Sequence, residues 1–483
     1  MEFRWTRRHV LALAVLCLAA LLDTIDVTVV NVAMPAIRNS LHFSEGGLAW
    51  MVDAYMVPFG GFLLLGGRTG DLLGRRRVLL AGTAVFAVAS LGSALAPTSA
   101  VMIVTRAVEG LAAAFVVPMT LAMLTSVFPA GPARNRAFSV WGGISAAAGT
   151  LGLVLGGALV SAAGWRWIFL INLPVGLVVI VAALRVLPAD RVPRGSGRPG
   201  GFDLGGAVSV TAGATLVAYA VAQTSSHAWG SGQTIGLLAG AAVLAGYFVI
   251  HEQRARDPLM PLSLWRNRSV TGANVVSALL SSAMFAVFYS TTLYMQQVLH
   301  YSALRTGLAY VPFGLSILIA AAVAPALVSL AGIRATSIAG SVVSLGGLLL
   351  LARVPPSGHL LTDIIGPTVI VGFGAGAVIV PTSVAAMSGV SAARHGVASA
   401  LLNVSRQLGG GLGLAVIATV VAASTARSAA AGNGAPAALT AGFHAGFAVS
   451  AALVAATVAV AAVLLREDGR GQRVNLVELQ ASH

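Results

Sequence analysis

Four carboxylates lie inside apolar runs of this 483-residue chain: Asp23, Asp26, Asp53 and Glu109. The chain has only 15 acidic residues, and all four of these fall within its first 110 positions. An ionisable side chain in the hydrocarbon of a bilayer costs at least about 2.5 kcal/mol, so it usually lines a cavity, pairs with another group or carries protons. Arg106 stands three residues before Glu109 and could balance one carboxylate. The pattern therefore favours a carrier that is coupled to protons.

The composition indicates a membrane protein built from many helices. Hydrophobic residues make up 57% of the chain and charged residues 9%, whereas about a quarter of the residues in a globular protein are charged. Apolar runs of about 20 residues, long enough to span a bilayer, recur from end to end. All 29 basic residues are arginines, and the absence of lysine excludes the Gly-Lys-Ser/Thr phosphate loop of an ATP-driven pump. The nine histidines show no metal-ligand spacing, and we expect neither an enzyme nor a bound cofactor or metal.

Fourteen spans can be read from the sequence. They cover 9–33, 47–67, 78–97, 99–128, 136–162, 166–187, 203–225, 231–251, 268–293, 303–328, 333–352, 361–388, 395–424 and 441–465. With the N-terminus inside, 22 of the 29 arginines fall on the cytoplasmic side. Positive charges concentrate on that side of membrane proteins. We therefore expect a multi-pass protein of a bacterial plasma membrane with both termini in the cytoplasm.

Two polar segments divide the spans into groups. A Gly-Pro-Arg-rich stretch covers 188–202, and a second polar segment covers 251–269. The predicted organisation is a six-helix bundle over 1–187, a linker with two extra spans over 188–267, a second six-helix bundle over 268–465 and a cytoplasmic tail over 466–483. Carriers built from such repeats often place the substrate near the bilayer midplane between them.

The loop after the second span carries a motif. It reads Gly67-Arg-Thr-Gly-Asp71-Leu-Leu-Gly74-Arg75-Arg76-Arg77. A basic loop that only sets topology would explain the arginines but not the Gly and Asp spacing. The segment resembles the G-x-x-x-D-x-x-G-R-R motif of the major facilitator superfamily. This resemblance implies an all-α fold of two six-helix bundles, here with two extra central helices, and a cytoplasmic loop that acts in gating.

Other segments resemble the fourteen-helix drug/proton antiporter branch of that superfamily, the quaternary-ammonium and multidrug efflux type. They are Asp26–Pro35, Trp165–Pro174, Tyr294–Gln296 with Tyr301, Ser302 and Gly307–Pro312, and Ser399–Gly410. Two positions depart from the pattern, since Glu109 stands where the family usually has Gln and Leu153 where antiporters typically have Pro. The resemblance implies export of hydrophobic, often cationic, drugs by alternating access, with protons as the coupling ion.

Depth along the spans groups the predicted proton-coupling residues. A helix rises about 1.5 Å per residue, which places Asp26, Asp53, Arg106 and Glu109 at overlapping depths in the outer half of the bilayer. Asp23 lies one turn deeper on the same face as Asp26. Asp26 is the strongest candidate because the resemblance singles it out. The alternative is a static pair of Arg106 with Glu109 or Asp26 that only fixes packing.

Two further groups of residues are candidates. The gating candidates are Gly67, Asp71, Gly74, Arg75, Arg76, Gly152, Gly156 and Gly157. The substrate-pocket candidates are Phe285, Phe288, Tyr289, Tyr294, Asn403, Arg406 and Gln407. Aromatic side chains of this kind suit adaptable binding, but an aromatic stripe on a helix is also typical of ordinary packing. Structural stabilisation is an equal alternative for Arg406 and Gln407.

The expected partners are protons, hydrophobic or cationic small molecules and the lipid bilayer. The net charge of +14 does not indicate nucleic acid because the arginines are scattered between spans, and we expect a monomer. Three alternatives stay open: a dedicated exporter of one endogenous metabolite or antibiotic, which would confer self-resistance; a nutrient importer; and a membrane sensor or scaffold that transports nothing.

Overall fold

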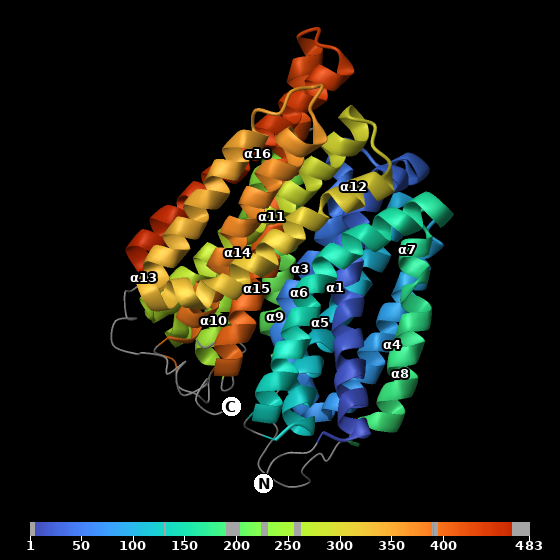
Figure 1. Cartoon of the computed structure of the whole chain (residues 1–483), viewed down its shortest axis with the longest axis vertical. Coiled ribbons are helices and arrows are strands. Elements are labelled where there is room, and N and C mark those ends of the chain that lie inside the picture. The colour runs from blue at the N-terminus through green and yellow to red at the C-terminus, as the bar shows by residue number, and fades with distance from the viewer. Residues whose placement is uncertain are drawn as a thin grey trace. The chain divides into compact units, whose positions relative to one another are not determined.

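The computed structural model describes residues 5–129, 132–189, 203–223, 230–255, 262–388, 390 and 395–465. Helices and the short connections between them account for all of these residues, as Figure 1 shows. The chain divides into two compact units. Unit 1 comprises Met1–Pro261 and Met295–Leu308, and unit 2 comprises Leu262–Tyr294 and Ala309–His483. The domain boundaries predicted at 187/188 and 267/268 stay predictions.

Unit 1 contains the N-terminal helices and both helices of the predicted extra pair. They are α1 (Arg7–Leu41), α2 (Glu45–Leu48), α3 (Trp50–Leu73), α4 (Arg75–Ala94), α5 (Ser99–Val127), α6 (Pro132–Ala163), α7 (Trp167–Leu170), α8 (Asn172–Val186), α9 (Leu204–Gln223) and α10 (Gly232–Arg254). Local signals set several helix starts. Thr6 caps α1 by accepting a hydrogen bond from the His9 backbone N–H, and Thr98 caps α5 by accepting one from the Val101 N–H. Threonine is one of the residues favoured at this position.

The helices of unit 1 pack closely around α1 and α5. Helix α1 contacts α5, α6 and α8, while α3 contacts α5 and α9. Gly110 allows one of the closest approaches, because a Cβ atom there would lie 2.0 Å from the carbonyl oxygen of Tyr55. Helix interfaces of membrane proteins use small residues in this way to bring backbones together. The contact brings α3 and α5 together at Tyr55 and Gly110.

A later part of the chain also belongs to unit 1. Residues 295–308 include the last four residues of the π-helix η2 (Tyr294–Val298) and most of α12 (Ala303–Ala309). The side-chain amide of Gln296 donates a hydrogen bond to the carbonyl oxygen of Val32 in α1 at 2.9 Å. The backbone N–H of Leu304 donates to the hydroxyl of Ser161 in α6 at 3.2 Å. This segment therefore completes unit 1.

Unit 2 contains the remaining helices. They are η1 (Leu262–Arg266), α11 (Arg268–Leu293), α13 (Val311–Leu351), η3 (Leu360–Ile365), α14 (Gly366–Met387), α15 (His395–Ala430) and α16 (Ala435–Leu464). Helix α11 packs against α14, α15 and α16, and α13 packs along α14. Gly409 lets α15 lie against α11, since a Cβ atom there would be 2.6 Å from the Cα atom of Ala278.

The predicted count of fourteen spans is not confirmed. Twelve helical segments among the described residues are long and apolar enough to cross a membrane. Two predicted spans, 303–328 and 333–352, fall within one of these segments, Ala303–Leu351, which is interrupted where Gly332 adopts φ 87°. A third predicted span, 136–162, falls on α6, of which Ala148–Ala163 is the apolar stretch among the described residues. The number fourteen therefore stays a prediction.

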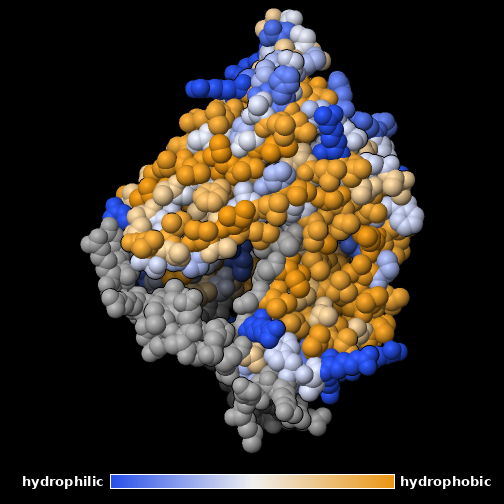
Figure 2. Space-filling view, in the orientation of Figure 1, coloured by the Kyte–Doolittle hydropathy of each residue, from blue (hydrophilic) through white to orange (hydrophobic). Residues whose placement is uncertain are grey.

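Apolar side chains cover much of the visible surface, and hydrophilic ones gather toward the ends of the helices (Figure 2). Large aliphatic residues are strongly exposed on several helices, among them Val88 at 71%, Val243 at 70% and Leu330 at 85%. A protein in water rarely exposes apolar patches of this extent. These surfaces match helices that face lipid.

Candidate functional site

Arg106 is the centre of a buried polar cluster in unit 1. It lies on α5 with 1% of its side chain exposed, and its guanidinium forms ion pairs with Asp26 of α1 and with Glu109 of α5. Its Nε donates a hydrogen bond to the carbonyl oxygen of Met51 at 3.3 Å, and its guanidinium carbon lies 4.4 Å from the centre of the Tyr55 ring. One arginine thus joins α1, α3 and α5.

Neutral donors complete the surroundings of both carboxylates that bind Arg106. Asn172, the first residue of α8, donates from Nδ2 to Asp26 Oδ1 at 2.7 Å and to the hydroxyl of Ser90 at 2.8 Å. Ser93 donates from its hydroxyl to Glu109 Oε1 at 2.8 Å. Each carboxylate is therefore held by Arg106 on one oxygen and by a neutral group on the other, which offsets part of the cost of burial.

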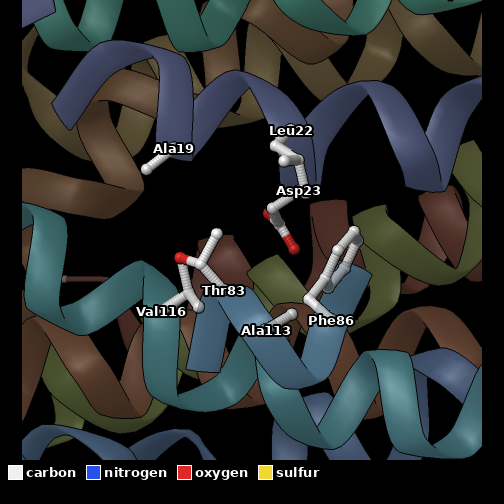
Figure 3. Close-up of a pocket in the computed structure, with 7 residues that line it drawn as sticks. All are labelled: Ala19, Leu22, Asp23, Thr83, Phe86, Ala113 and Val116. Carbon is white, nitrogen blue, oxygen red and sulfur yellow. The ribbon is translucent and has the colours of Figure 1, made fainter. Parts of the chain in front are cut away.

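Asp23 joins the cluster through Tyr55. The Tyr55 hydroxyl donates a hydrogen bond to Asp23 Oδ1 at 2.5 Å, while its ring contacts Arg106. The Asp23 side chain also lines a small cavity between α1, α4 and α5 (Figure 3), where its carboxylate points toward Thr83 and Phe86. The lining is otherwise formed by Ala19, Leu22, Ala113 and Val116. Polar contacts therefore run from Arg106 through Tyr55 to a carboxylate at a cavity.

Asp53 is buried but is not part of this network. Its side chain is 1% exposed, and within the described residues its Oδ1 atom has no hydrogen-bond partner. Asp53 precedes Tyr55 by two residues, so the two side chains point to different sides of α3. Of the four predicted carboxyls, the structure brings Asp26 and Glu109 to Arg106 directly and Asp23 through Tyr55.

The arginines of the predicted gating loop bind the ends of two helices. Arg75 donates from Nη1 to the carbonyl oxygen of Ala122 at 2.9 Å and to the hydroxyl of Ser126 at 3.0 Å, both in the last turns of α5. Arg76 donates a hydrogen bond to the carbonyl oxygen of Leu184 near the end of α8. Cations at helix C-termini satisfy free carbonyls and interact favourably with the helix dipole. The loop therefore ties α4 to α5 and α8.

The other positions of the loop motif are placed as follows. Gly74 separates α3 from α4 with φ 103°, a conformation that side chains rarely adopt. Gly67 faces Pro118 of α5, with 3.8 Å between a Cβ atom placed there and the Pro118 Cβ. Asp71 lies in α3, but its side chain is outside the described residues. Its role in gating stays a prediction.

The glycines predicted for span 5 lie at helix contacts. A Cβ atom at Gly152 would lie 2.0 Å from Thr28 Oγ1, and one at Gly156 would lie 2.6 Å from Val29 Cγ2, both in α1. Gly157 faces the backbone of α12 instead. Helix α6 therefore packs closely between α1 and α12, and any movement of α6 would have to break or shift these contacts.

The four aromatic pocket candidates lie on α11 or at its end, and the structure gives them different surroundings. Tyr289 and Tyr294 are buried, whereas Phe285 and Phe288 are half-buried. Tyr294 donates a hydrogen bond to the carbonyl oxygen of Pro355. Phe288 packs edge to face on Phe313 with 5.2 Å between ring centres. These contacts are those of a packed core, and membership of a pocket stays a prediction.

The polar pocket candidates lie together on α15. Asn403, Arg406 and Gln407 are all half-buried. Arg406 donates from Nη2 to the hydroxyl of Ser383 in α14 at 3.2 Å, and Asn403 donates from Nδ2 to the carbonyl oxygen of Ser399 in its own helix at 3.2 Å.

A second polar cluster fastens the ends of α9 and α10 in unit 1. Asp203 caps α9 by accepting from the Gly206 N–H at 2.8 Å, and its Oδ1 lies 2.7 Å from His251 Nε2 in α10. Burial acts to raise the pKa of Asp203, but its hydrogen bonds with the Gly206 N–H, His251 and Glu252 outweigh this effect and lower the pKa below its usual value. Asp203 is therefore a carboxylate that stabilises this hairpin.

Four contact residues of the Arg106 cluster were not among the predicted site residues: Tyr55, Ser90, Ser93 and Asn172. Asn172 lies inside the motif Trp165–Pro174, so the motif marked it without showing its partner. For Tyr55, the signal in the sequence is a tyrosine inside the predicted span 47–67. Across the described part of the chain, no group of three or more His, Cys, Asp and Glu side chains could hold a metal ion.

Comparison with known proteins identifies the family of this chain. The family model described as Major Facilitator Superfamily matches residues 16–414. A cephamycin export protein from Amycolatopsis lactamdurans is 37% identical over 404 residues, which are 83% of this chain and 82% of that protein. A puromycin resistance protein from Streptomyces alboniger is 33% identical over 401 residues, 82% of this chain and 79% of that protein.

The fold is also similar to solved structures. A bacterial homologue of the human lysosomal transporter Spinster, in an inward-facing and unoccupied conformation, aligns with a TM-score of 0.67 at 15% identity. The alignment covers 97% of this chain and 100% of that one. At this identity the likeness concerns the fold alone.

Proposed function

Because this chain belongs to the Major Facilitator Superfamily, we propose that it is a secondary transporter that exports hydrophobic or cationic drugs or antibiotics in exchange for protons. It is a multi-span membrane transporter rather than an enzyme. The names of the cephamycin export protein and the puromycin resistance protein support small-molecule export. The expectations of a monomer and of two cytoplasmic termini are part of the proposal.

The observation that carries the proposal is the placement of Arg106 between Asp26 and Glu109 in the interior of unit 1. A single guanidinium can balance a single carboxylate, and an unbalanced buried charge is costly. The surplus carboxyl must therefore bind a proton or a cation. Protonation of Asp26 would leave Arg106 paired with Glu109, and release of that proton would restore a negative site. Protons and cationic substrates can compete at such a site.

Asp23 and Asp53 extend the same argument. Asp23 reaches the cluster through Tyr55 and faces a cavity, so it could receive a proton from that side. Asp53 is buried, and its Oδ1 has no hydrogen-bond partner within the described residues, so it is cheap to bury only in its neutral form. Both are proposed as further proton-binding groups. By alternating access, the transporter would then move protons into the cell and substrate out of it.

The decisive experiment measures transport in inside-out membrane vesicles with ethidium as the probe. We expect energised uptake of ethidium by the wild type, loss of this uptake with a protonophore, and at least a tenfold lower rate for Asp26→Asn at equal expression. Asp363→Asn, in the only acidic residue between Leu262 and Leu465, is the matched control. Wild-type rates from Asp26→Asn, or uptake that ignores the protonophore, would refute proton coupling through this cluster.

A dedicated exporter of a single antibiotic is the second candidate, and the relative that is named for cephamycin export favours it. A panel of unrelated dyes and antibiotics separates the two, because a multidrug exporter lowers the accumulation of several of them. Protection against one compound alone would support the dedicated exporter. Gradient-driven accumulation inside intact cells would indicate an importer, and the absence of any gradient-driven flux would indicate a sensor or scaffold.

A further inference from the structure

Arg406 carries a positive charge in the interior of unit 2. It lies on α15 about 16 Å beyond the first residue of the helix, at a rise of about 1.5 Å per residue, and its side chain is half-buried. Within the described residues, the recorded hydrogen-bond partner of its guanidinium is the hydroxyl of Ser383, a neutral group. A guanidinium has five N–H donors and stays charged in proteins, so one serine leaves most of its binding capacity unused.

Among the described residues of unit 2, no carboxylate reaches this charge. Between Leu262 and Leu465 the sequence contains one acidic residue, Asp363. Asp363 accepts a hydrogen bond from the His359 N–H at 2.7 Å, in the segment before α14. Ser383 lies 17 residues after Gly366, the first residue of α14, or about 25 Å along that helix. Asp363 therefore cannot reach the guanidinium that contacts Ser383.

Arg106 in unit 1 is an arginine whose charge is neutralised by carboxylates, and it serves as a comparison for Arg406. It has two carboxylates, a backbone carbonyl and an aromatic ring around its guanidinium. Among the described residues of its own unit, Arg406 has no such anion. Removing a charge from water without a partner is costly, and the attraction of an anion is stronger there than in water. An anion from outside the described residues of unit 2 would therefore stabilise Arg406.

The neighbours of Arg406 on α15 could help to bind such an anion. At 100° per residue, Asn403, Arg406 and Gln407 occupy a sector about 100° wide on one side of the helix. The adjacent side is already used, because the Ser405 hydroxyl donates to Asn274 Oδ1 of α11 at 2.8 Å and Gly409 touches the α11 backbone. Two amides thus flank a guanidinium on the part of α15 that lies beside the α11 contact.

We propose that Arg406 binds a carboxylate group of the exported molecule, with Asn403 and Gln407 as neighbouring amide contacts. A guanidinium matches a carboxylate with two parallel N–H···O hydrogen bonds. The inference rests on the proposed function, since it assigns part of the substrate chemistry. It extends the expected substrates from hydrophobic cations to amphiphilic acids and zwitterions, which carry a carboxylate on an apolar body.

The test compares two probes that differ only in this group. Dansyl-leucine has a carboxylate, and dansyl-leucine amide has a neutral carboxamide in its place. Binding to the purified full-length protein is followed by dansyl fluorescence, without any proton gradient. We expect the wild type to bind the acid at least tenfold more tightly than the amide. Arg406→Gln should lose this preference while its affinity for the amide stays within twofold, and Arg406→Lys should keep part of it.

Arg427→Gln is the matched control, since Arg427 is an exposed arginine near the end of the same helix. It should leave both affinities unchanged, and size-exclusion chromatography checks that each variant is folded. Three results would overturn the proposal. Arg406→Gln could lose affinity for both probes equally, the wild type could bind both probes with equal affinity, or the wild type could bind neither probe. Ethidium transport is measured in parallel. If transport proves independent of the proton gradient while the protein still prefers the acid, the result counts against the proposed function only.

Discussion

The ring of Tyr55 lies 4.4 Å from the guanidinium carbon of Arg106, within the range of a cation–π contact. The hydroxyl of the same tyrosine donates to Asp23, so Tyr55 links the charged centre to the carboxylate at the cavity. Because the two contacts use different parts of the side chain, they can be separated experimentally.

Tyr55→Phe should keep the ring contact and remove the hydrogen bond to Asp23. Hydrogen bonds to charged groups contribute about 1.5–3 kcal/mol, so if Asp23 carries protons to the cluster we expect proton-driven ethidium transport in vesicles to fall by about tenfold. Tyr219→Phe, in which the partly exposed Tyr219 on α9 loses its hydroxyl, is the control. Equal rates for wild type and Tyr55→Phe would show that the Tyr55–Asp23 contact has only a structural role.

Glu109→Gln should be tolerated far better than Asp26→Asn. Arg106 would still be paired with Asp26, and a glutamine at position 109 can still accept a hydrogen bond from Ser93. We expect at least half of the wild-type transport rate, measured at equal expression with ethidium in vesicles. A rate for Glu109→Gln as low as that for Asp26→Asn would instead make Glu109 the essential proton-binding group.

Gly110→Ala should destabilise unit 1. The new Cβ atom would lie 2.0 Å from the carbonyl oxygen of Tyr55, so α3 and α5 would have to separate. Overpacking of this kind costs about 1–3 kcal/mol, and the thermal unfolding temperature in detergent should fall by several degrees. Gly246→Ala in α10 is the matched control, because no atom lies within 4 Å of a Cβ there. It should unfold no earlier than the wild type, and similar melting of both variants would contradict the close contact.

The Asp203 cluster predicts a pH-dependent contribution to stability. Since the pKa of Asp203 is lowered in the folded protein, its carboxylate stabilises the fold above the unfolded pKa of about 3.9, and this contribution is lost as the pH falls through the folded value. Asp203→Asn should therefore unfold at a lower temperature than the wild type at pH 6, with a smaller difference at pH 3.5. A difference that is the same at both pH values would exclude this source of stability.

The depth of a residue along its helix predicts which side chains lie at the same level of the bilayer. It does not predict which of them are in contact. The sequence places Asp26, Arg106 and Glu109 at one level, and the structure joins them. Asp53 lies at a similar level, yet depth contains no information on the direction in which a side chain points around its helix. The rotation of α3 is set by its packing on α5 and α9, and this depends on contacts far apart in sequence.

Asn172 illustrates a second limit of the sequence. Its position in a motif marked the segment, but its two hydrogen-bond partners are 146 and 82 residues away. The fold class followed from the apolar runs and from the resemblance carried by the loop Gly67–Arg77, because both are local features of the sequence. The number of spans did not follow as clearly, since two predicted spans share the apolar segment Ala303–Leu351, which Gly332 interrupts with φ 87°.

The assignment of residues 295–308 to unit 1 has a consequence for biosynthesis. Gly157 and Gly307 meet the backbones of α12 and α6, so this late segment is part of the packing of the first unit. Unit 1 is therefore incomplete until translation has passed residue 308, by which point all of α11 of unit 2 has been synthesised. The two units cannot mature strictly one after the other, and a nascent chain released before residue 295 would expose the unfilled surface of α6 to lipid and to quality-control proteases.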